Sequence, residues 1–71
     1  MTIRISYSKH TLEKMDSFGI ERKEIEKILQ KGMKWQKQEK WYANMYGTEI
    51  VFQKKEDVIF IITVYLERRE E

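Results

Sequence analysis

The strongest constraint on this chain is the segment Val58–Leu66, which is apolar throughout apart from Thr63. β-Branched and aromatic residues of this kind favour a strand, and a strand that is apolar on both faces has to lie inside a sheet. The segment is much shorter than the roughly 20 residues that a membrane-spanning helix requires. With 71 residues in total, the chain can build one domain around this strand, and we expect residues 1–66 to form it.

Two short helices are predicted between residues 8 and 32. Ser8 has the side chain of an N-cap, and Gly19 is the residue type that ends a helix in the left-handed conformation. The second helix has Glu24 in its first turn, where a negative charge suits the helix dipole, and Gly32 is expected to end it as Gly19 ends the first. Apolar residues at helical spacing form the expected buried faces: Leu12, Met15 and Phe18, then Ile25, Ile28 and Leu29.

Alternation of apolar and polar residues predicts the strands. It is visible at residues 3–7, before the first helix, and at residues 40–46, and the apolar run at residues 50–52 predicts the strand before the last one. The expected order is β-α-α-β-β-β: an α+β fold of two layers, in which two N-terminal helices pack on a small, mostly antiparallel sheet. The charged tail at residues 67–71 is expected to stay outside the domain.

The connections between the predicted strands are less regular. Residues 33–39 are polar and basic, and we expect an irregular segment there. Residues 47–48 have the composition of a two-residue hairpin turn with glycine first, and a turn at residues 43–44 is the alternative register. The four charged residues at 54–57 predict the last turn.

The composition excludes several classes of protein. Cysteine is absent and His10 is the only histidine, which excludes a disulfide scaffold, a thiolate zinc site and a site with several histidine ligands. The N-terminus lacks the apolar region of a signal peptide, so we expect a cytoplasmic protein. From the composition, we also expect that it uses no cofactor and no metal. A domain of this size is marginally stable by itself, and a homodimer or a partner protein would add buried surface.

Positive charge concentrates in residues 21–40, where seven basic and four acidic residues give +3, against +2 for the whole chain. Lysine recurs at every third position from Lys31 to Lys40, and two tryptophans lie among these lysines. Lysines neutralise phosphates and indoles stack on unpaired bases, so one interpretation is a groove for single-stranded RNA. The alternative is a solvated loop whose tryptophans anchor it to the core. The candidate RNA-binding residues are Arg4, Lys31, Lys34, Trp35, Lys37, Lys40 and Trp41.

His10 is the candidate for acid–base chemistry, because histidine is the residue type that titrates near neutral pH. It falls in the first turn of the first predicted helix, with Lys14 one turn later on the same side. A neutral imidazole there can take a proton from a ribose 2′-hydroxyl, and the alternative is a surface histidine or a helix-end hydrogen bond. Tyr46 and Tyr65 lie in predicted strands, where their hydroxyls can transfer protons or simply pack with a hydrated end.

Four stretches of the chain resemble a small bacterial and archaeal protein family. Ser8–Met15 is similar to that family's S-x-H-A-x-x-R-M, residues 18–20 to its R-G-I, and Glu24–Leu29 to its E-x-I-x-x-x-L. Residues 62–65 are similar to its closing V-V-T-V-Y. The family is placed with the RelE/ParE-like toxins, and the resemblance spans residues 3–66. It implies a RelE-like fold of two helices on a small sheet.

The resemblance also implies a metal-independent endoribonuclease that acts on messenger RNA as the toxin of a toxin–antitoxin pair. In such a toxin the 2′-hydroxyl attacks the adjacent phosphate, and positive side chains stabilise the charge that develops. The catalytic residues implied are His10, Lys14 and Tyr65, and Tyr46 is a further candidate. An antitoxin-like protein is then the expected partner. The other hypothesis is a non-catalytic RNA- or protein-binding module on the same fold, as a monomer or a homodimer.

Overall fold

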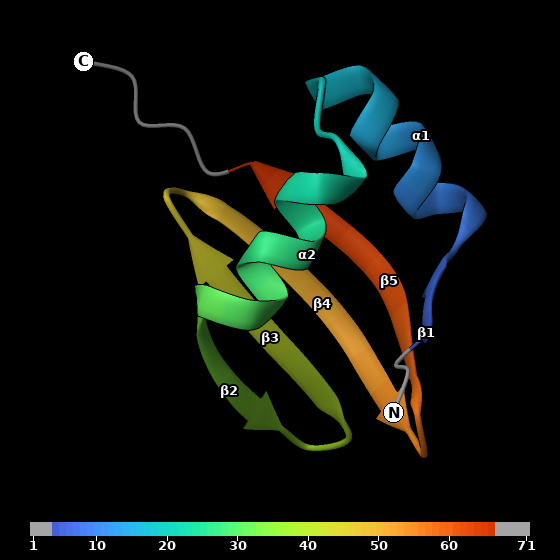
Figure 1. The fold of residues 1–71 in the computed structure, drawn as a ribbon, viewed down its shortest axis with the longest axis vertical. Coiled ribbons are helices and arrows are strands. Elements are labelled where there is room, and N and C mark those ends of the chain that lie inside the picture. Colours follow the sequence, from blue (N-terminus) through green and yellow to red (C-terminus); the bar gives the residue numbers. More distant parts are fainter. Residues whose placement is uncertain (1–3, 67–71) are drawn as a thin grey trace.

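Two helices and five strands follow one another along residues 4–66, the part of the chain that the computed structural model describes. They are β1 (Arg4–Tyr7), α1 (Lys9–Phe18), α2 (Arg22–Lys31), β2 (Met33–Lys37), β3 (Lys40–Met45), β4 (Thr48–Lys55) and β5 (Val58–Leu66). The strands form one sheet in the order β1-β5-β4-β3-β2. β1 pairs with β5 in parallel, and the other neighbours are antiparallel. Both helices lie on one face of this sheet (Figure 1).

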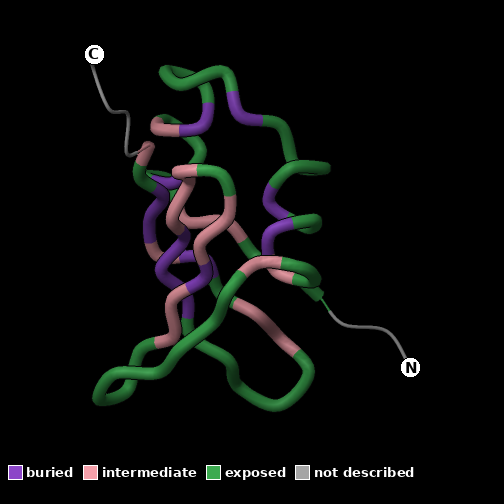
Figure 2. The backbone as a smooth tube through the Cα atoms, turned by 90° about the vertical axis from the view of Figure 1, so that its left-hand side faces the viewer, coloured by how far each residue is buried: buried purple, intermediate pink, exposed green. Residues whose placement is uncertain are grey.

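This arrangement confirms the predicted α+β fold of two layers and the interior position of β5. Buried residues gather where the helices meet the sheet, whereas the hairpin ends beyond the helices are exposed (Figure 2). No helix in the described part of the chain is long and apolar enough to cross a membrane. Ile3 and the predicted tail at residues 67–71 lie outside the described residues.

The structure has one strand more than the sequence predicted. Residues 33–39 were expected to be irregular, but residues 33–37 form β2, which pairs with β3 up to Lys37 and Lys40. A two-residue turn joins the two strands, and its Gln38 has a positive φ of 60°. All five residues of β2 are exposed, so this edge strand shows none of the apolar alternation by which a strand is recognised.

The turn between β3 and β4 lies one residue earlier than predicted. It consists of Tyr46 and Gly47, whose φ angles of 54° and 80° are both positive. Two positive φ angles match the twist of a hairpin. Strand pairing continues to Met45 and Thr48, the residues on either side of this turn. The alternative turn at residues 43–44 is therefore wrong. The last turn occupies residues 56–57, the second half of the predicted four-residue segment.

α1 has the predicted ends but a different buried face. Ser8 is its N-cap, and Gly19 ends it in the left-handed conformation with φ 71°. The buried residues are Thr11 and Met15, whereas Leu12, expected in the core, is 43% exposed. The expected core residue Phe18 is also exposed. The helix therefore packs through a narrow stripe that starts at a polar side chain.

A β-bulge interrupts the pairing of β4 with β5. Val51 lies opposite Thr63, but the next residue of β4, Phe52, lies opposite Ile61. Ile62 is therefore the extra residue on β5. Because a bulge disrupts the ladder locally, the carbonyl groups at this point of β5 need other hydrogen-bond donors.

Two hydroxyl side chains at the start of α1 supply those donors. The Ser8 hydroxyl donates to the Ile62 carbonyl oxygen at 2.9 Å and accepts the Thr11 N–H at 3.1 Å. The Thr11 hydroxyl donates to the Ile61 carbonyl oxygen at 3.1 Å, and the Ser8 N–H donates to the same oxygen at 3.2 Å. Thr11 is fully buried at this contact. The helix start is thereby fixed against the bulge.

α2 begins with a capping box, in which the Glu21 N–H donates to the Glu24 side chain at 3.0 Å. Its buried stripe is confirmed, with Ile25 and Ile28 inside the core. Gly32 is the C-cap of this helix, as predicted, but unlike Gly19 its backbone is extended, with φ −72° and ψ 165°. A Cβ atom at Gly32 would lie 2.6 Å from the Ile28 carbonyl oxygen and 2.9 Å from that of Asn44. Glycine is needed here because α2 and β3 approach closely.

Tyr7 brings a buried phenol to the edge of the core. Its ring packs beside the Arg22 guanidinium, 5.3 Å from the ring centroid, and its hydroxyl is buried without a hydrogen-bond partner among the described residues. Burial raises the pKa of this phenol above its ordinary value of 10.0, and the Glu26 carboxylate raises it further, whereas Arg22 lowers it in part. The folded protein therefore holds the Tyr7 proton more tightly than the unfolded chain does.

Gly32→Ala should destabilise the protein by about 3 kcal/mol, because its methyl group meets two backbone oxygens that cannot move independently. Gly19→Ala is the matched control. It has nothing within 4 Å of the added carbon, so only the cost of a positive φ remains, about 1 kcal/mol. Urea denaturation of both variants measures the difference, and equal losses would contradict the close contact at Gly32.

Tyr7→Phe should leave stability at neutral pH almost unchanged, because the hydroxyl that it removes has no partner. A raised folded-state pKa gives stability that is present below pH 10.0 and lost as the pH rises through the folded value. The wild-type protein should therefore lose more stability than the variant between about pH 9 and pH 11. Denaturation curves across this range test it. Parallel losses would show that Tyr7 has no raised pKa.

Candidate nucleic-acid interface

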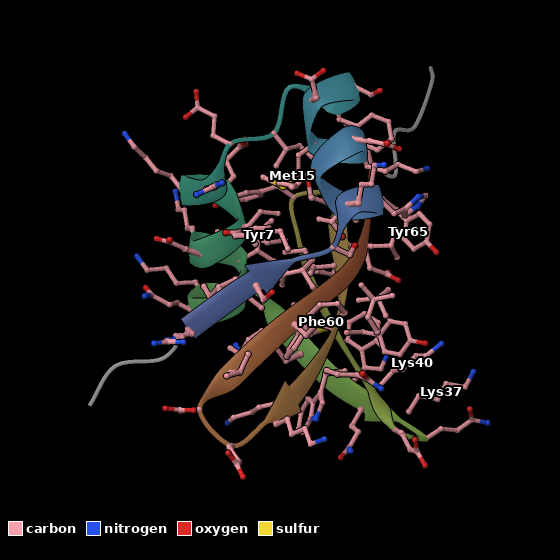
Figure 3. The ribbon with its side chains drawn as sticks, turned by 90° about the vertical axis from the view of Figure 1, so that its right-hand side faces the viewer. Tyr7, Met15, Lys37, Lys40, Phe60 and Tyr65 are labelled. Carbon is pink, nitrogen blue, oxygen red and sulfur yellow. The ribbon has the colours of Figure 1, made fainter. Side chains whose placement is uncertain are left out.

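The sheet leaves one face without a helix, and we call it the open face. Strand pairing places three cross-strand rows of side chains on it. Lys37 and Lys40 lie on the side of the sheet away from α2, as does Tyr65 (Figure 3). The rows are Met33, Asn44, Glu49 and Tyr65; Trp35, Tyr42, Val51 and Thr63; and Lys37, Lys40, Gln53 and Phe60.

Aromatic rings are spread across the open face. Trp35 and Tyr42 lie opposite each other on β2 and β3, and their rings stack with centroids 5.6 Å apart and planes 6° apart. Phe60 and Tyr65, both on β5, are 42% and 45% exposed. Their shared exposure makes the open face a candidate surface for a ligand.

Positive side chains gather at one end of the open face. Lys37 and Lys40 lie opposite each other where the β2–β3 hairpin closes. Arg4 and Lys55 each pair with Val58 from the two sides of β5, so they also point to this face. Each of these four cations is exposed. Cations that lie together raise the local positive potential and attract phosphates.

The structure divides the lysine- and tryptophan-rich segment between the two faces. Lys34 lies opposite Ala43 on the side of the helices, where its Nζ donates to the Gly32 carbonyl oxygen at 3.3 Å. Trp41 is on the same side and stacks on Phe52, with ring centroids 6.3 Å apart. Lys31 lies in the last turn of α2. The candidate RNA-binding residues of this segment therefore do not share one surface, because Trp35, Lys37 and Lys40 lie on the opposite face of the sheet.

Lys14 and Tyr65 meet at the other end of the open face. The Lys14 Nζ atom lies 5.9 Å from the Tyr65 ring centroid and 5.5 Å from that of Phe18. His10 is exposed one turn before Lys14 on α1. Tyr46 is 89% exposed at the tip of the β3–β4 hairpin, outside this contact. Of the four catalytic candidates, two are in contact.

Sequence reasoning missed the contribution of Tyr42, Phe60 and Lys55 to the open face. Their strands were predicted, but the face to which each residue points follows from the pairing of β2 and from the bulge. In the middle row, the side chains of Val51 and Thr63 are both buried. Within residues 4–66 no three His, Asp or Glu side chains lie close enough together to hold a metal ion.

Comparison with known proteins gives one match. The family described as "Domain of unknown function (DUF4258)" matches residues 7–66, which run from the end of β1 to the last residue of β5. No curated protein and no solved structure matches the chain. The matched region includes α1 with its hydrogen bonds to β5, the bulge and nearly all of the open face. The family description assigns no activity to them.

Proposed function

The chain belongs to the DUF4258 family, and we propose that it binds single-stranded RNA across the open face of its sheet. The observation that carries this proposal is the stacked pair of Trp35 and Tyr42 beside the facing lysines Lys37 and Lys40. Aromatic rings on a sheet stack on unpaired bases, and the adjacent lysines neutralise the phosphates between those bases. Both elements are needed, and this face supplies both.

The distribution of charge suggests a path for the strand. Arg4, Lys55, Lys40 and Lys37 follow one end of the sheet from β1 to β2, where the turn residues Glu39, Glu56 and Asp57 also lie, and Glu49 lies in the row at the other end. The backbone of an RNA strand is therefore expected along the cationic end, with its bases directed over the rings. Duplex RNA would bind less well, because its stacked and paired bases cannot reach exposed rings.

Metal-independent RNA cleavage is the second candidate function, and the contact between Lys14 and Tyr65 favours it. In this reaction the ribose 2′-oxygen bonds to the adjacent phosphorus and the bond from phosphorus to the 5′-oxygen breaks. The products are a 2′,3′-cyclic phosphate and a free 5′-hydroxyl. His10 would take the 2′-hydroxyl proton, Tyr65 or Tyr46 would give a proton to the leaving oxygen, and Lys14 would stabilise the negative phosphate.

The resemblance to RelE-like toxins fits this second function, and an antitoxin-like protein that covers the basic open face would then be the partner. Such a toxin acts in the cytoplasm, where messenger RNA is translated. A binder without cleavage uses the same open face but does not need His10. The two functions therefore differ in a single measurable respect, which is the fate of the bound RNA.

Replacing Lys37 and Lys40 together with glutamine should weaken binding of a short fluorescein-labelled single-stranded RNA. The loss of two phosphate contacts should lower the slope of log K against log salt concentration by about 1.4. Fluorescence anisotropy at several salt concentrations measures both quantities. Lys23→Gln with Lys27→Gln, which removes the same charge from exposed positions of α2, is the matched control and should bind like the wild-type protein.

Trp35→Ala separates stacking from charge in the same assay. It should weaken binding by about tenfold and leave the salt slope unchanged, because it removes a stacking surface and no cation. Circular dichroism should show that the sheet remains folded. Lack of RNA binding by the wild-type chain, or equal losses in the α2 control, would overturn the proposal.

Cleavage is tested on the same RNA in the presence of EDTA. If the second function holds, His10→Ala should slow cleavage about 100-fold while RNA affinity stays the same. Tyr65→Phe keeps the ring beside Lys14 and removes only the hydroxyl, so it isolates proton transfer. Induced expression of the wild-type chain and His10→Ala, with growth and messenger RNA integrity followed, extends the test to cells. If the RNA stays intact with the wild-type protein, cleavage is excluded and RNA binding remains the proposed function.

A further inference from the structure

The helices cover only part of their side of the sheet, and a groove remains beneath the last turns of α2. It has a cavity of about 340 Å³. A neighbouring cavity of about 360 Å³ shares Leu29 and Ile59 with it and is otherwise lined by Ile5, Glu26 and Gln30. We call the first cavity the helix-side groove; its lining is Leu29, Lys34, Trp41, Phe52, Lys54 and Ile59.

The apolar floor of the helix-side groove is Trp41, which packs on Phe52, a core residue only 3% exposed. The rings of Trp41 and Phe52 stack there with centroids 6.3 Å apart and planes 19° apart, and both side chains come from adjacent strands, β3 and β4. Leu29 of α2 forms a wall above them. A planar ring that enters the groove can lie against this floor and lose most of its contact with water.

Among residues 4–66, two lysines are the only charged residues in the lining of the helix-side groove. Lys34 comes from β2 and Lys54 from β4, where it pairs with Ile59. One donor of Lys34 is directed to the Gly32 carbonyl oxygen, and an ammonium group has two more. An acid, Glu26, lines the neighbouring cavity. An anionic group is therefore favoured at the lysines and disfavoured toward Glu26.

We propose that the helix-side groove binds a small organic anion with a planar aromatic body, such as an aromatic carboxylate or sulfonate. Its ring lies against Trp41, which covers the buried Phe52, and its charged group is drawn to Lys34 or Lys54, which flank the Trp41–Phe52 row. The cavity volume fits a ligand of this size. This site is on the opposite side of the sheet from the open face, so it does not depend on RNA binding.

The probe is 8-anilinonaphthalene-1-sulfonate, titrated into the full chain. We expect saturable fluorescence with one site per chain, and about fivefold weaker binding for Lys34→Gln and for Lys54→Gln. Lys37→Gln with Lys40→Gln, on the open face, is the matched control and should not change the affinity. The uncharged analogue N-phenyl-1-naphthylamine should bind more weakly than the sulfonate. Equal binding of the two probes, or equal losses in the open-face control, would overturn the proposal.

The two tryptophans provide a second readout that needs no variant. The sulfonate should shift the indole N–H resonance of Trp41 and leave that of Trp35 in place, since the two rings lie on opposite faces. Single-stranded RNA should do the reverse. A shift at Trp35, or none at Trp41, on addition of the sulfonate would overturn the helix-side site. The absence of an RNA effect would instead count against the open face alone.

Discussion

The arrangement of this domain depends on the hydrogen bonds between the start of α1 and the bulge in β5. The hydroxyl oxygens of Ser8 and Thr11 lie 2.8 Å apart, and each also lies within 3.1 Å of a β5 carbonyl oxygen. These three contacts share two hydroxyl hydrogens. The Ser8 N–H also reaches the Ile61 carbonyl, so Thr11 can turn its hydrogen to Ser8 without leaving that carbonyl unpaired. The anchor holds α1 beside β5, brings Lys14 to Tyr65 and leaves the far side of the sheet free of helices.

Sequence patterns predicted the elements in which burial and local chemistry agree. β5 is apolar, Ser8 and Gly19 are typical helix ends, and all three predictions are confirmed. The prediction for the buried face of α1 was wrong at Leu12, which was favoured because it is hydrophobic. Thr11 lies against the bulge instead, because its hydroxyl donates to the Ile61 carbonyl oxygen. A local pattern contains no information about a carbonyl 50 residues away.

The candidate site was only partly predictable for a different reason. The lysines and tryptophans of residues 31–41 were predicted to form one surface because they are close along the chain, which is possible in a loop. In a strand, an odd step in sequence reverses the face, so Lys34 and Lys37 point to opposite sides of β2. The hairpin then returns Lys40 to the side of Lys37 and Trp41 to the side of Lys34. Without knowledge of β2, the sequence could name these residues but could not sort them into two surfaces.

The pairing of β1 with β5 joins the first and last strands of the described chain, and it sets an order of assembly. The hairpins from β2 to β5 are local, with two-residue turns, and their closure costs little entropy. The Ser8–Ile62 hydrogen bond spans 54 positions and cannot form before Ile62 has been synthesised. The docking of α1 therefore waits for the last strand, whereas β2 and β3 need only each other to pair.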